Sequence, residues 1–473
     1  MHVSSLYGDY SIGTLGKEAF EFIDFLSECG FGIWQVLPLC MTDSFNSPYS
    51  SKSWFGFNPY FIDLPTLFSK GFITEGELNS AKSSEKYLVE FERLRSERLP
   101  LLFKAAKRAG RDLKTREEMS SFFAERPYLG TAASFLSIKD KNGGAPWQQW
   151  QNEEFCEERL FAWQFIQYEF FCQWSKIKKH AEKKGVKIVG DMPIYVSLDS
   201  ADVWSEPENF LLDSKGYPLA VSGVPPDYFS PDGQLWNNPI YDYKRMEENG
   251  FLWWKTRIKH MLSLFDGIRI DHFRGFDAYW SVPSGAKSAR EGKWIEGPSR
   301  KIIDAIRSET KDGLIIAEDL GDITDSVREL LSYSKFSGMR VFQFAFLGDY
   351  LSPHLPHNYI NECVAYTGTH DNNTLLGYLY ECDTATRVKI FEYCGYRGSS
   401  IDEGARQVMS VMLRSSAGAV VFPIQDILGF GADTRMNTPG VAKGNWAYRV
   451  TAEQLSSINR EKYRKALSIF GRL

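Results

Sequence analysis

Four carboxylates stand where short apolar segments of this sequence end. Asp191 closes VKIVGD, Asp271 closes GIRID, Glu318 closes LIIAE, and Asp371 follows VAYTGTH. If these segments are parallel strands, their carboxyl ends meet at one edge and the acids gather around one pocket. A single strand-end acid is often only a helix cap or a loop anchor. Four together repel one another, which costs stability and is usually tolerated for chemistry, so the set predicts an active site.

Two kinds of chemistry use such a cluster. Carboxylate oxygens can hold a hard divalent cation, or a pair of acids can break and form glycosidic bonds. The cation would be favoured by ligating histidines and a Gly-rich phosphate loop, but no such loop follows any of the segments, and His272 is expected on the opposite strand face in a structural role. Aromatic residues make up 15% of the chain and suit stacking against sugar rings. Sugar chemistry is therefore favoured, and no metal or cofactor is predicted.

Arg269 stands two residues before Asp271. Because side chains alternate along a strand, these two share one face, while Ile268 and Ile270 point to the other. A guanidinium beside a carboxylate keeps the carboxylate ionised and fixes its orientation. Glu318, preceded by apolar residues and near other acids, is expected to have a raised pKa. The two acids are thus predicted to differ in protonation.

The segments that position these residues predict a barrel. Eight short apolar or β-branched segments, bounded by Gly, Asp or Pro, are predicted as strands over 2–6, 33–37, 186–191, 265–271, 314–318, 340–344, 364–369 and 419–424. Helical periodicity follows several of them. One example is the apolar pattern over 19–26, in a helix that is predicted to end at Gly30. Continuously apolar strands that alternate with helices are typical of a parallel sheet, and eight such units close into a (β/α)8 TIM barrel.

The predicted strands are unevenly spaced. About 150 residues separate the second from the third, far more than one crossover needs. We expect a mainly helical insertion over 65–185, in which Thr74 and Glu77 form a capping-box pattern and a long helix covers 153–184. A second insertion, over 200–243, is expected to form a lid. Residues 1–473 are thus predicted to be one catalytic barrel with large rim insertions and no separate C-terminal β domain.

Charge and cysteine content exclude several function classes. The net charge is −5, no Lys or Arg block occurs, and nucleic acid is therefore not an expected partner. No apolar run approaches the roughly 20 residues of a membrane span. The seven scattered cysteines form no CxxC pair, so we expect reduced thiols and a cytoplasmic protein.

Several longer runs resemble a known family. The runs GIRIDHFRGF (267–276), IIAEDLG (315–321), GTHDNNT (368–374) and GDMPIYVSLDSADVW (190–204) resemble the 4-α-glucanotransferases called amylomaltases or disproportionating enzymes, in the α-amylase clan. So do WQVLPL (34–39), NPYFIDL (58–64), GVPPDYFSPDGQLW (223–236) and RMNTPG (435–440). The resemblance covers nearly the whole chain, with the runs in the expected order.

This resemblance implies a 4-α-glucanotransferase that acts on α-1,4-glucans and maltooligosaccharides by retaining double displacement. It implies that Asp271 is the nucleophile, Glu318 the general acid/base and Asp371 the residue that stabilises the transition state. It also implies substrate contacts from Asp191, His370, Tyr49, Trp54, Asn58, Tyr228, Phe229, Trp236 and Asn437. A mainly hydrolytic α-1,4-glucanase and a non-catalytic glucan-binding protein remain as alternatives.

Overall fold

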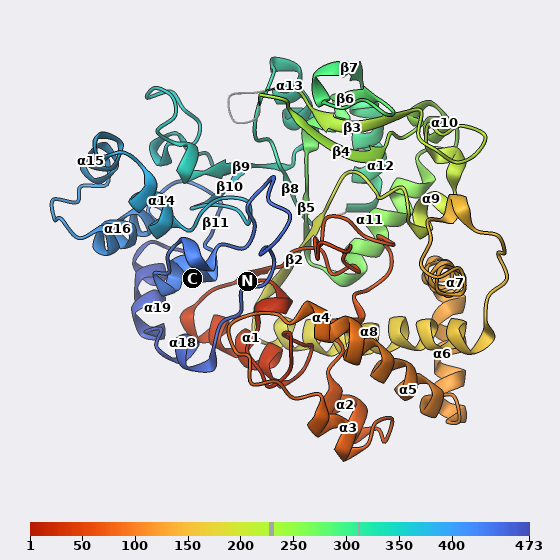
Figure 1. Cartoon of the computed structure of the whole chain (residues 1–473). Coiled ribbons are helices and arrows are strands. Elements are labelled where there is room, and N and C mark those ends of the chain that lie inside the picture. Colours follow the sequence, from red (N-terminus) through yellow and green to blue (C-terminus); the bar gives the residue numbers. More distant parts are fainter. Residues whose placement is uncertain (227–230, 311–312) are drawn as a thin grey trace.

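A seven-stranded parallel sheet lies at the centre of the computed structural model, which describes residues 1–226, 231–310 and 313–473 (Figure 1). Its strands, in spatial order, are β1 (Ile33–Gln35), β2 (Lys187–Met192), β5 (Gly267–Ile270), β8 (Leu314–Ala317), β9 (Ser337–Val341), β10 (Cys363–Tyr366) and β11 (Ala419–Val421). Every neighbouring pair is parallel. The sheet is nearly closed into a barrel, which confirms the predicted fold class.

The inner face of this sheet is a small apolar core of its own. It contains Val189, Ile316, Met339, Val341, Val364 and Tyr366. The outer face packs on helices in the main core, where Ile188 and Ile268 are fully buried. Both faces are therefore covered, which explains why the strands read as continuously apolar segments.

The strand predicted over 2–6 is wrong. Residues Val3–Ser5 form a 3-10 helix instead. The backbone there has other partners: the amide of Gly13 donates to Ser4 O (3.0 Å) and the amide of Val450 donates to Ser5 O (2.9 Å). These bonds turn the segment away from the sheet, and β1 is left as one end of the strand order. The other seven predicted strands each overlap an observed one.

The first helix, α1 (Lys17–Cys29), precedes β1. The long interval between β1 and β2 consists mainly of helices. Thr74 and Glu77 form the predicted capping box at the start of α3. The predicted long helix is α8, which runs from Glu157 to Lys183 and packs on α5 and α7. The helices of this interval are α2 (Leu64–Ser69), α3 (Glu75–Ser80), α4 (Phe91–Arg93), α5 (Leu99–Ala109), α6 (Leu113–Glu125), α7 (Pro127–Lys141) and α8 (Glu157–Lys183).

A second, antiparallel sheet lies beside the barrel, at the top of Figure 1. Its strands are β4 (Gln234–Pro239), β3 (Ala220–Val224), β6 (Ala278–Pro283) and β7 (Lys293–Glu296), in that spatial order. Two of them precede β5 in the chain and two follow it. The sheet therefore adjoins the carboxyl end of β5, where Asp271 lies.

The remaining helices follow the barrel strands. They are α9 (Ala201–Ser205), α10 (Tyr243–Glu248), α11 (Leu252–Leu264), α12 (Ser299–Thr310), α13 (Asp325–Ser334), α14 (Leu375–Glu381), α15 (Thr384–Tyr393), α16 (Ile401–Leu413), α17 (Ile424–Leu428), α18 (Ala452–Ser456) and α19 (Arg460–Ile469). The chain thus ends in helices, without a strand after β11. None of the helices in the described residues is both long and apolar enough to cross a bilayer.

Candidate active site

Two neighbouring strands deliver Asp271 and Glu318 to the same level of the barrel. The register pairs Ile270 of β5 with Ala317 of β8, and the two acids are the next residues on their strands. The pairing continues one step further, because the amide of Glu318 donates to Ile270 O at 3.0 Å. The two acids therefore leave the sheet side by side, as predicted from their strand-end positions.

Arg269 is a shared counterion for two carboxylates. Its Nη1 lies 2.9 Å from both oxygens of Asp191 and 2.9 Å from Oδ1 of Asp271. The guanidinium is 6% exposed. Burial alone would lower the pKa of Arg269, but the charges of these two carboxylates raise it well above its ordinary value. Asp271 thus has a permanent positive charge against one of its oxygens.

Glu318 lies in an environment that favours the protonated form of its carboxyl group. Its Oε2 accepts the amide N–H of His272 at 2.7 Å, and its Oε1 accepts the amide N–H of Leu320 at 3.2 Å. Burial and then the charge of Asp271 raise the pKa of Glu318 from its ordinary 4.5 to about 8, against the opposing effect of Arg269. The carboxyl group is therefore mostly protonated at neutral pH, which confirms the expected raised pKa.

The backbone at His272 directs that contact. His272 follows Asp271 immediately and has a φ of 51°, in the left-handed region. This conformation is uncommon for a residue with a side chain and is concentrated at functional sites. It turns the amide of the residue next to one acid onto the carboxyl group of the other.

A polar layer lies against the other side of Arg269. Asp191, on β2, accepts the hydroxyl of Tyr49 at 2.7 Å as well as the guanidinium. The Tyr49 ring stacks on His370, with 4.7 Å between ring centroids and 14° between the planes. Burial raises the pKa of Asp191, while the charge of Arg269 opposes the shift. These residues, predicted as substrate contacts, lie together in the structure.

Asp371 ends this chain of contacts at the surface. Its side chain is 48% exposed, and its Oδ1 lies 3.4 Å from Nε2 of His370. The same oxygen accepts Nδ2–H of Asn437 at 2.6 Å. The third predicted acid and its predicted neighbours His370 and Asn437 are therefore brought together.

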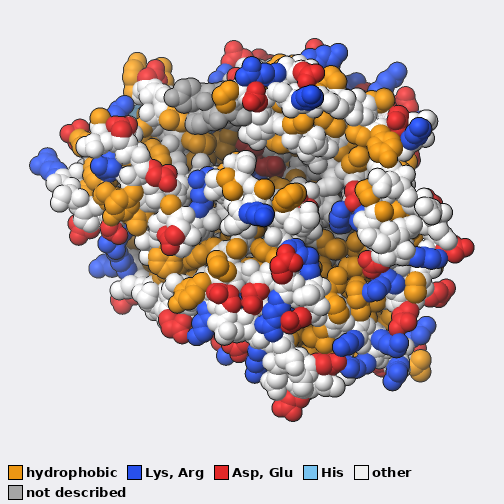
Figure 2. All heavy atoms as spheres, viewed as in Figure 1, with side chains coloured by type: hydrophobic (Ala, Val, Ile, Leu, Met, Phe, Trp, Pro, Cys, Tyr) orange, Lys and Arg blue, Asp and Glu red, His pale blue; other side chains and the backbone are white. Residues whose placement is uncertain are grey.

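Figure 2 shows a hollow in the middle of one face with acidic side chains at its floor.

Trp236, on β4, is a second predicted aromatic residue near the acids. Its ring meets His272 edge-on, with 4.9 Å between centroids. Its Nε1 donates to Gln234 Oε1 at 3.2 Å, so the ring orientation is fixed on its own strand. The indole is therefore held next to the residue that follows Asp271.

Trp54 and Asn58 are both buried, and Trp54 lines a small cavity together with Asp191. Trp54 is 3% exposed, in the core, with the guanidinium carbon of Arg257 over its ring at 5.3 Å. Asn58 is 2% exposed and caps a 3-10 helix by accepting the amide of Tyr60 at 3.0 Å. Both have packing or capping roles here. The other two predicted contacts, Tyr228 and Phe229, lie outside the described residues.

Two residues near the site were not predicted. Met339, on β9, accepts Nε–H of Arg269 at its sulfur, at 3.4 Å. Trp446 packs on Tyr49 and His370, with ring centroids 5.9 and 5.8 Å away. Trp446 follows the RMNTPG run closely in the sequence, which is a signal for it. Met339 has no such signal, because its contact with Arg269 depends on the strand order, in which β9 lies two strands from β5 with β8 between them. Over the ranges that the structure describes, no three His, Cys, Asp or Glu side chains are grouped as metal ligands.

Comparisons with known proteins identify the family of this chain. A family model described as 4-alpha-glucanotransferase matches residues 1–455. A 4-alpha-glucanotransferase of Clostridium butyricum is 41% identical over 495 aligned positions, covering 100% of both chains, and one of Aquifex aeolicus is 40% identical, covering 100% of this chain and 98% of that one. The solved amylomaltase from Streptococcus agalactiae in complex with acarbose has a TM-score of 0.96 at 35% identity, covering 100% of this chain and 98% of that one. This chain therefore belongs to the 4-alpha-glucanotransferase family.

Proposed function

We propose that this protein is a 4-α-glucanotransferase that moves a segment of an α-1,4-glucan to the 4-hydroxyl of an acceptor glucan or glucose, with Asp271 as nucleophile and Glu318 as general acid/base. One observation carries the assignment of roles: Glu318 accepts the amide of the residue that follows Asp271, at 2.7 Å, so both carboxyl groups border one position. They also differ in charge, since Arg269 pairs with Asp271 while the pKa of Glu318 is about 8. Retaining glycosyl transfer requires this pairing of an ionised and a protonated acid.

The reaction takes place in two displacements. In the first, the Asp271 carboxylate attacks C1 of the donor sugar while Glu318 gives its proton to the glycosidic oxygen. The bond from C1 to that oxygen breaks, and the reducing-end fragment leaves with a 4-hydroxyl. In the second, the Glu318 carboxylate takes the proton of an acceptor 4-hydroxyl, whose oxygen attacks C1 and releases Asp271. Two inversions at C1 retain the α configuration.

The charge of Asp271 changes the pKa of Glu318 between these two displacements. While Asp271 is ionised, its negative charge contributes to the raised pKa of Glu318. When Asp271 becomes a neutral ester, that contribution disappears and the pKa of Glu318 falls. Glu318 is therefore an acid in the first displacement and a better base in the second.

The residues around this pair suit sugar binding. Asp371 is half exposed, with Asn437 and His370 holding one oxygen. A carboxylate in that position can accept sugar hydroxyls and stabilise the positive charge that develops on the ring in the transition state. Asp191 and Tyr49 form the polar layer next to Arg269, and Trp236 offers a ring to an acceptor sugar. The insertion over 200–243 supplies Trp236, which is consistent with a rim segment that helps to exclude water.

Product analysis with maltotriose tests the proposed activity. Transfer produces a ladder of longer maltooligosaccharides together with glucose and maltose, because each glycosyl-enzyme is resolved by a sugar hydroxyl. Hydrolysis produces only glucose and maltose. A ladder resolved by chromatography supports the proposal, and its absence at every acceptor concentration would leave the protein a hydrolytic glucanase.

The pH profile should show an alkaline limb near pH 8. The first displacement needs Glu318 protonated, and its pKa is about 8 in the free protein. As pH rises above this value the protonated fraction falls, so we expect kcat/KM for maltotriose to decline about tenfold per pH unit. Initial rates from pH 6 to 10 measure this, with a donor whose leaving group needs no proton, such as α-maltosyl fluoride, as the control. A limb that is equally steep with the fluoride would assign it to another group.

Replacing Tyr49 with Phe should weaken catalysis without unfolding the protein. The change removes the hydroxyl that donates to Asp191 and keeps the ring that stacks on His370. A hydrogen bond to a charged group is worth about 10- to 100-fold, and we expect kcat/KM to fall by that amount. Tyr333→Phe is the matched control, because the Tyr333 hydroxyl donates to Asp304 at 2.8 Å on the surface. Its kcat/KM should change less than about twofold.

A further inference from the structure

The loops that follow β5 and β8 are joined by a series of contacts that continues beyond the two acids. The amide of Phe273 donates to Glu318 O at 3.1 Å, one residue past the bond from the His272 amide to the Glu318 side chain. Further on, Ser326 Oγ donates to Asp277 Oδ2 at 2.8 Å. The separation of the two acids therefore depends on how these loops are held together.

Arg274 adds a charged contact to this series. It lies in the 3-10 helix Phe273–Phe276, three residues after Asp271. Its Nη1 donates to Asp322 O, and the same nitrogen lies 3.3 Å from Asp322 Oδ2. Asp322 lies four residues after Glu318. The guanidinium thus reaches from the loop of one acid to the loop of the other.

The surroundings of Arg274 hold its guanidinium in one place. The Arg274 side chain is 8% exposed, and the ring of Trp294 lies over it, with 3.9 Å from the guanidinium carbon to the ring centroid. Its Nε is buried without a hydrogen-bond partner in the described part of the chain. A charged donor kept buried in this way costs free energy, which is unusual for a side chain that only fills space.

Trp294, on β7, connects this contact with the antiparallel sheet. It is paired with Trp280 of β6, and the two rings meet edge-on with 5.1 Å between centroids. Nε1–H of Trp280 in turn donates to Ala289 O at 2.8 Å. The indole that covers Arg274 is therefore itself supported by the sheet that also carries Trp236.

We propose that Arg274 is a positioning residue for the acid pair: held by Trp294, it fixes the loop after Glu318 and thereby the distance from Glu318 to Asp271. This inference rests on the roles proposed above for the two acids. Arginine suits the task, because a planar guanidinium stacks on a ring and donates hydrogen bonds in its own plane at the same time. A lysine keeps the charge but lacks this planar group.

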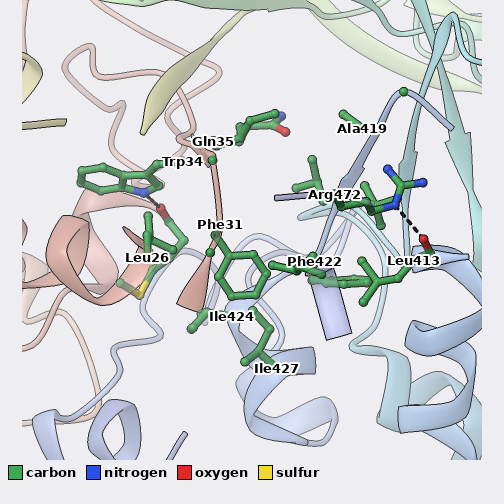
Figure 3. Close-up of a pocket in the computed structure, with 18 of the residues that line it drawn as sticks. Leu26, Phe31, Trp34, Gln35, Leu413, Ala419, Phe422, Ile424, Ile427 and Arg472 are labelled. Atoms are coloured by element: carbon green, nitrogen blue, oxygen red, sulfur yellow. Dashed lines mark hydrogen bonds between the residues drawn. The ribbon is translucent and has the colours of Figure 1, made fainter. Parts of the chain in front are cut away.

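Arg472 makes the same kind of carbonyl contact away from the acids. Figure 3 shows its guanidinium beside Leu413, whose carbonyl oxygen accepts Nε–H at 2.7 Å. Its Nη2 donates to Ser415 O at 2.8 Å and to Ala417 O at 2.9 Å. These carbonyl groups precede β11 and so lie toward the amino ends of the strands, whereas the acids follow the carboxyl ends. Arg472 is therefore a matched control for an arginine with a purely structural role.

The test compares Arg274→Lys with Arg472→Lys in the full chain. We expect Arg274→Lys to lower kcat for maltotriose about 10- to 100-fold, because a small displacement of the acids slows the chemical step. KM should change less than about threefold, since the proposed sugar contacts at Asp191 and Asp371 remain. Arg472→Lys should lower Tm at least as much as Arg274→Lys and leave kcat and KM within about twofold of the original. Initial rates over a range of maltotriose concentrations and thermal unfolding measure these quantities.

The alkaline limb of the pH profile gives a readout that lost stability alone does not move. The charged groups around Glu318 are Asp271 and Arg269 at the end of β5 and Asp319 on its own loop, which pairs with Arg340. The charge of Asp271 raises the pKa of Glu318 more than Arg269 lowers it, so a looser acid pair lowers that pKa. A lysine at position 274 keeps the net charge, and only the distance changes.

In Arg274→Lys we therefore expect the limb to move to lower pH by about 0.5 unit or more, with no movement in Arg472→Lys. Initial rates with maltotriose from pH 6 to 10 measure both. A limb that stays in place, or a kcat within twofold of the original, would overturn the positioning role. The proposed function fails separately, when the unmodified chain itself produces no transfer ladder from maltotriose.

Trp294 gives a second series, which decides the question if Arg274→Lys does not fold. Trp294→Leu removes the ring over the guanidinium, and we expect kcat to fall about 5- to 20-fold with the same movement of the limb. Trp294→Phe keeps a ring for stacking and should restore kcat to within about threefold of the original. Equal activity of the Leu and Phe variants would contradict the proposal, because the ring would then have no part in holding Arg274.

Discussion

Asp271→Asn should abolish transfer, with kcat/KM for maltotriose falling at least about 10⁴-fold. The amide has nearly the shape of the carboxylate, but it does not form the glycosyl ester. It also leaves Arg269 paired with Asp191 alone and removes the charge that helps to raise the pKa of Glu318. Both displacements are therefore affected by one change. Initial rates with maltotriose, followed by release of glucose, measure the loss.

The control for this variant is Asp325→Asn. Asp325 has a 93% exposed side chain and pairs with Arg328 on its own helix, so the change should alter kcat/KM less than about twofold. Asp271→Asn should still bind maltooligosaccharides, because Asp191, Tyr49 and Asp371 remain in place. Residual activity within about tenfold of the original would refute Asp271 as nucleophile. A protein that binds glucans but shows no transfer even before mutation would instead be a glucan-binding protein.

The acids of the site could be predicted because their positions follow from the barrel. Each of Asp191, Asp271 and Glu318 ends an apolar segment or directly follows one, and parallel strands bring such ends to one edge. The pairing of Arg269 with Asp271 could be predicted too, since residues two apart share a strand face. These inferences need only local periodicity and the fold class. The structure bears out the strand ends and the ion pair of Arg269 with Asp271, and the catalytic roles stay predictions.

The wrong strand over 2–6 arose where tertiary contacts decide the outcome. The segment over 2–6 has the composition of a strand, but Gly13 and Val450 bond its backbone outside the sheet. Trp54 and Asn58 were assigned to substrate by resemblance; Trp54 is buried under Arg257 and Asn58 makes a capping bond to Tyr60, and their contact with substrate stays a prediction. A sequence shows that an aromatic residue stands near a motif. It does not show which side of the loop is packed.

Backbone conformation was also beyond prediction at His272. The position of His272 in the sequence suggested a structural side chain, and nothing in the sequence indicates a φ of 51°. That conformation aims the amide at Glu318 and joins the two acids geometrically. The contribution comes from the main chain, so residue type carries no signal for it.

Glu318→Gln should separate the two displacements. With maltotriose we expect kcat/KM to fall about 10³- to 10⁴-fold, because glutamine gives no proton to the departing glycosidic oxygen. With α-maltosyl fluoride as donor, fluoride leaves without a proton, and formation of the glycosyl-enzyme should stay within about tenfold of the original rate. The second displacement still lacks its base. The glycosyl ester on Asp271 should therefore accumulate, with the mass increase of one maltosyl group in the intact protein.

Azide then tests the geometry at the trapped intermediate. A small anion needs no general base, so it should attack C1 of the ester and release maltosyl azide of α configuration, restoring turnover in Glu318→Gln but not in Asp271→Asn. Glu329→Gln, an exposed change on α13, should behave like the original protein with either donor. If Glu318→Gln slows the fluoride as strongly as maltotriose, its carboxyl group holds the sugar and does not transfer the proton. Equal loss with both donors would thus contradict the raised pKa of Glu318 as the source of the catalytic acid, since that pKa matters only where a leaving group needs a proton.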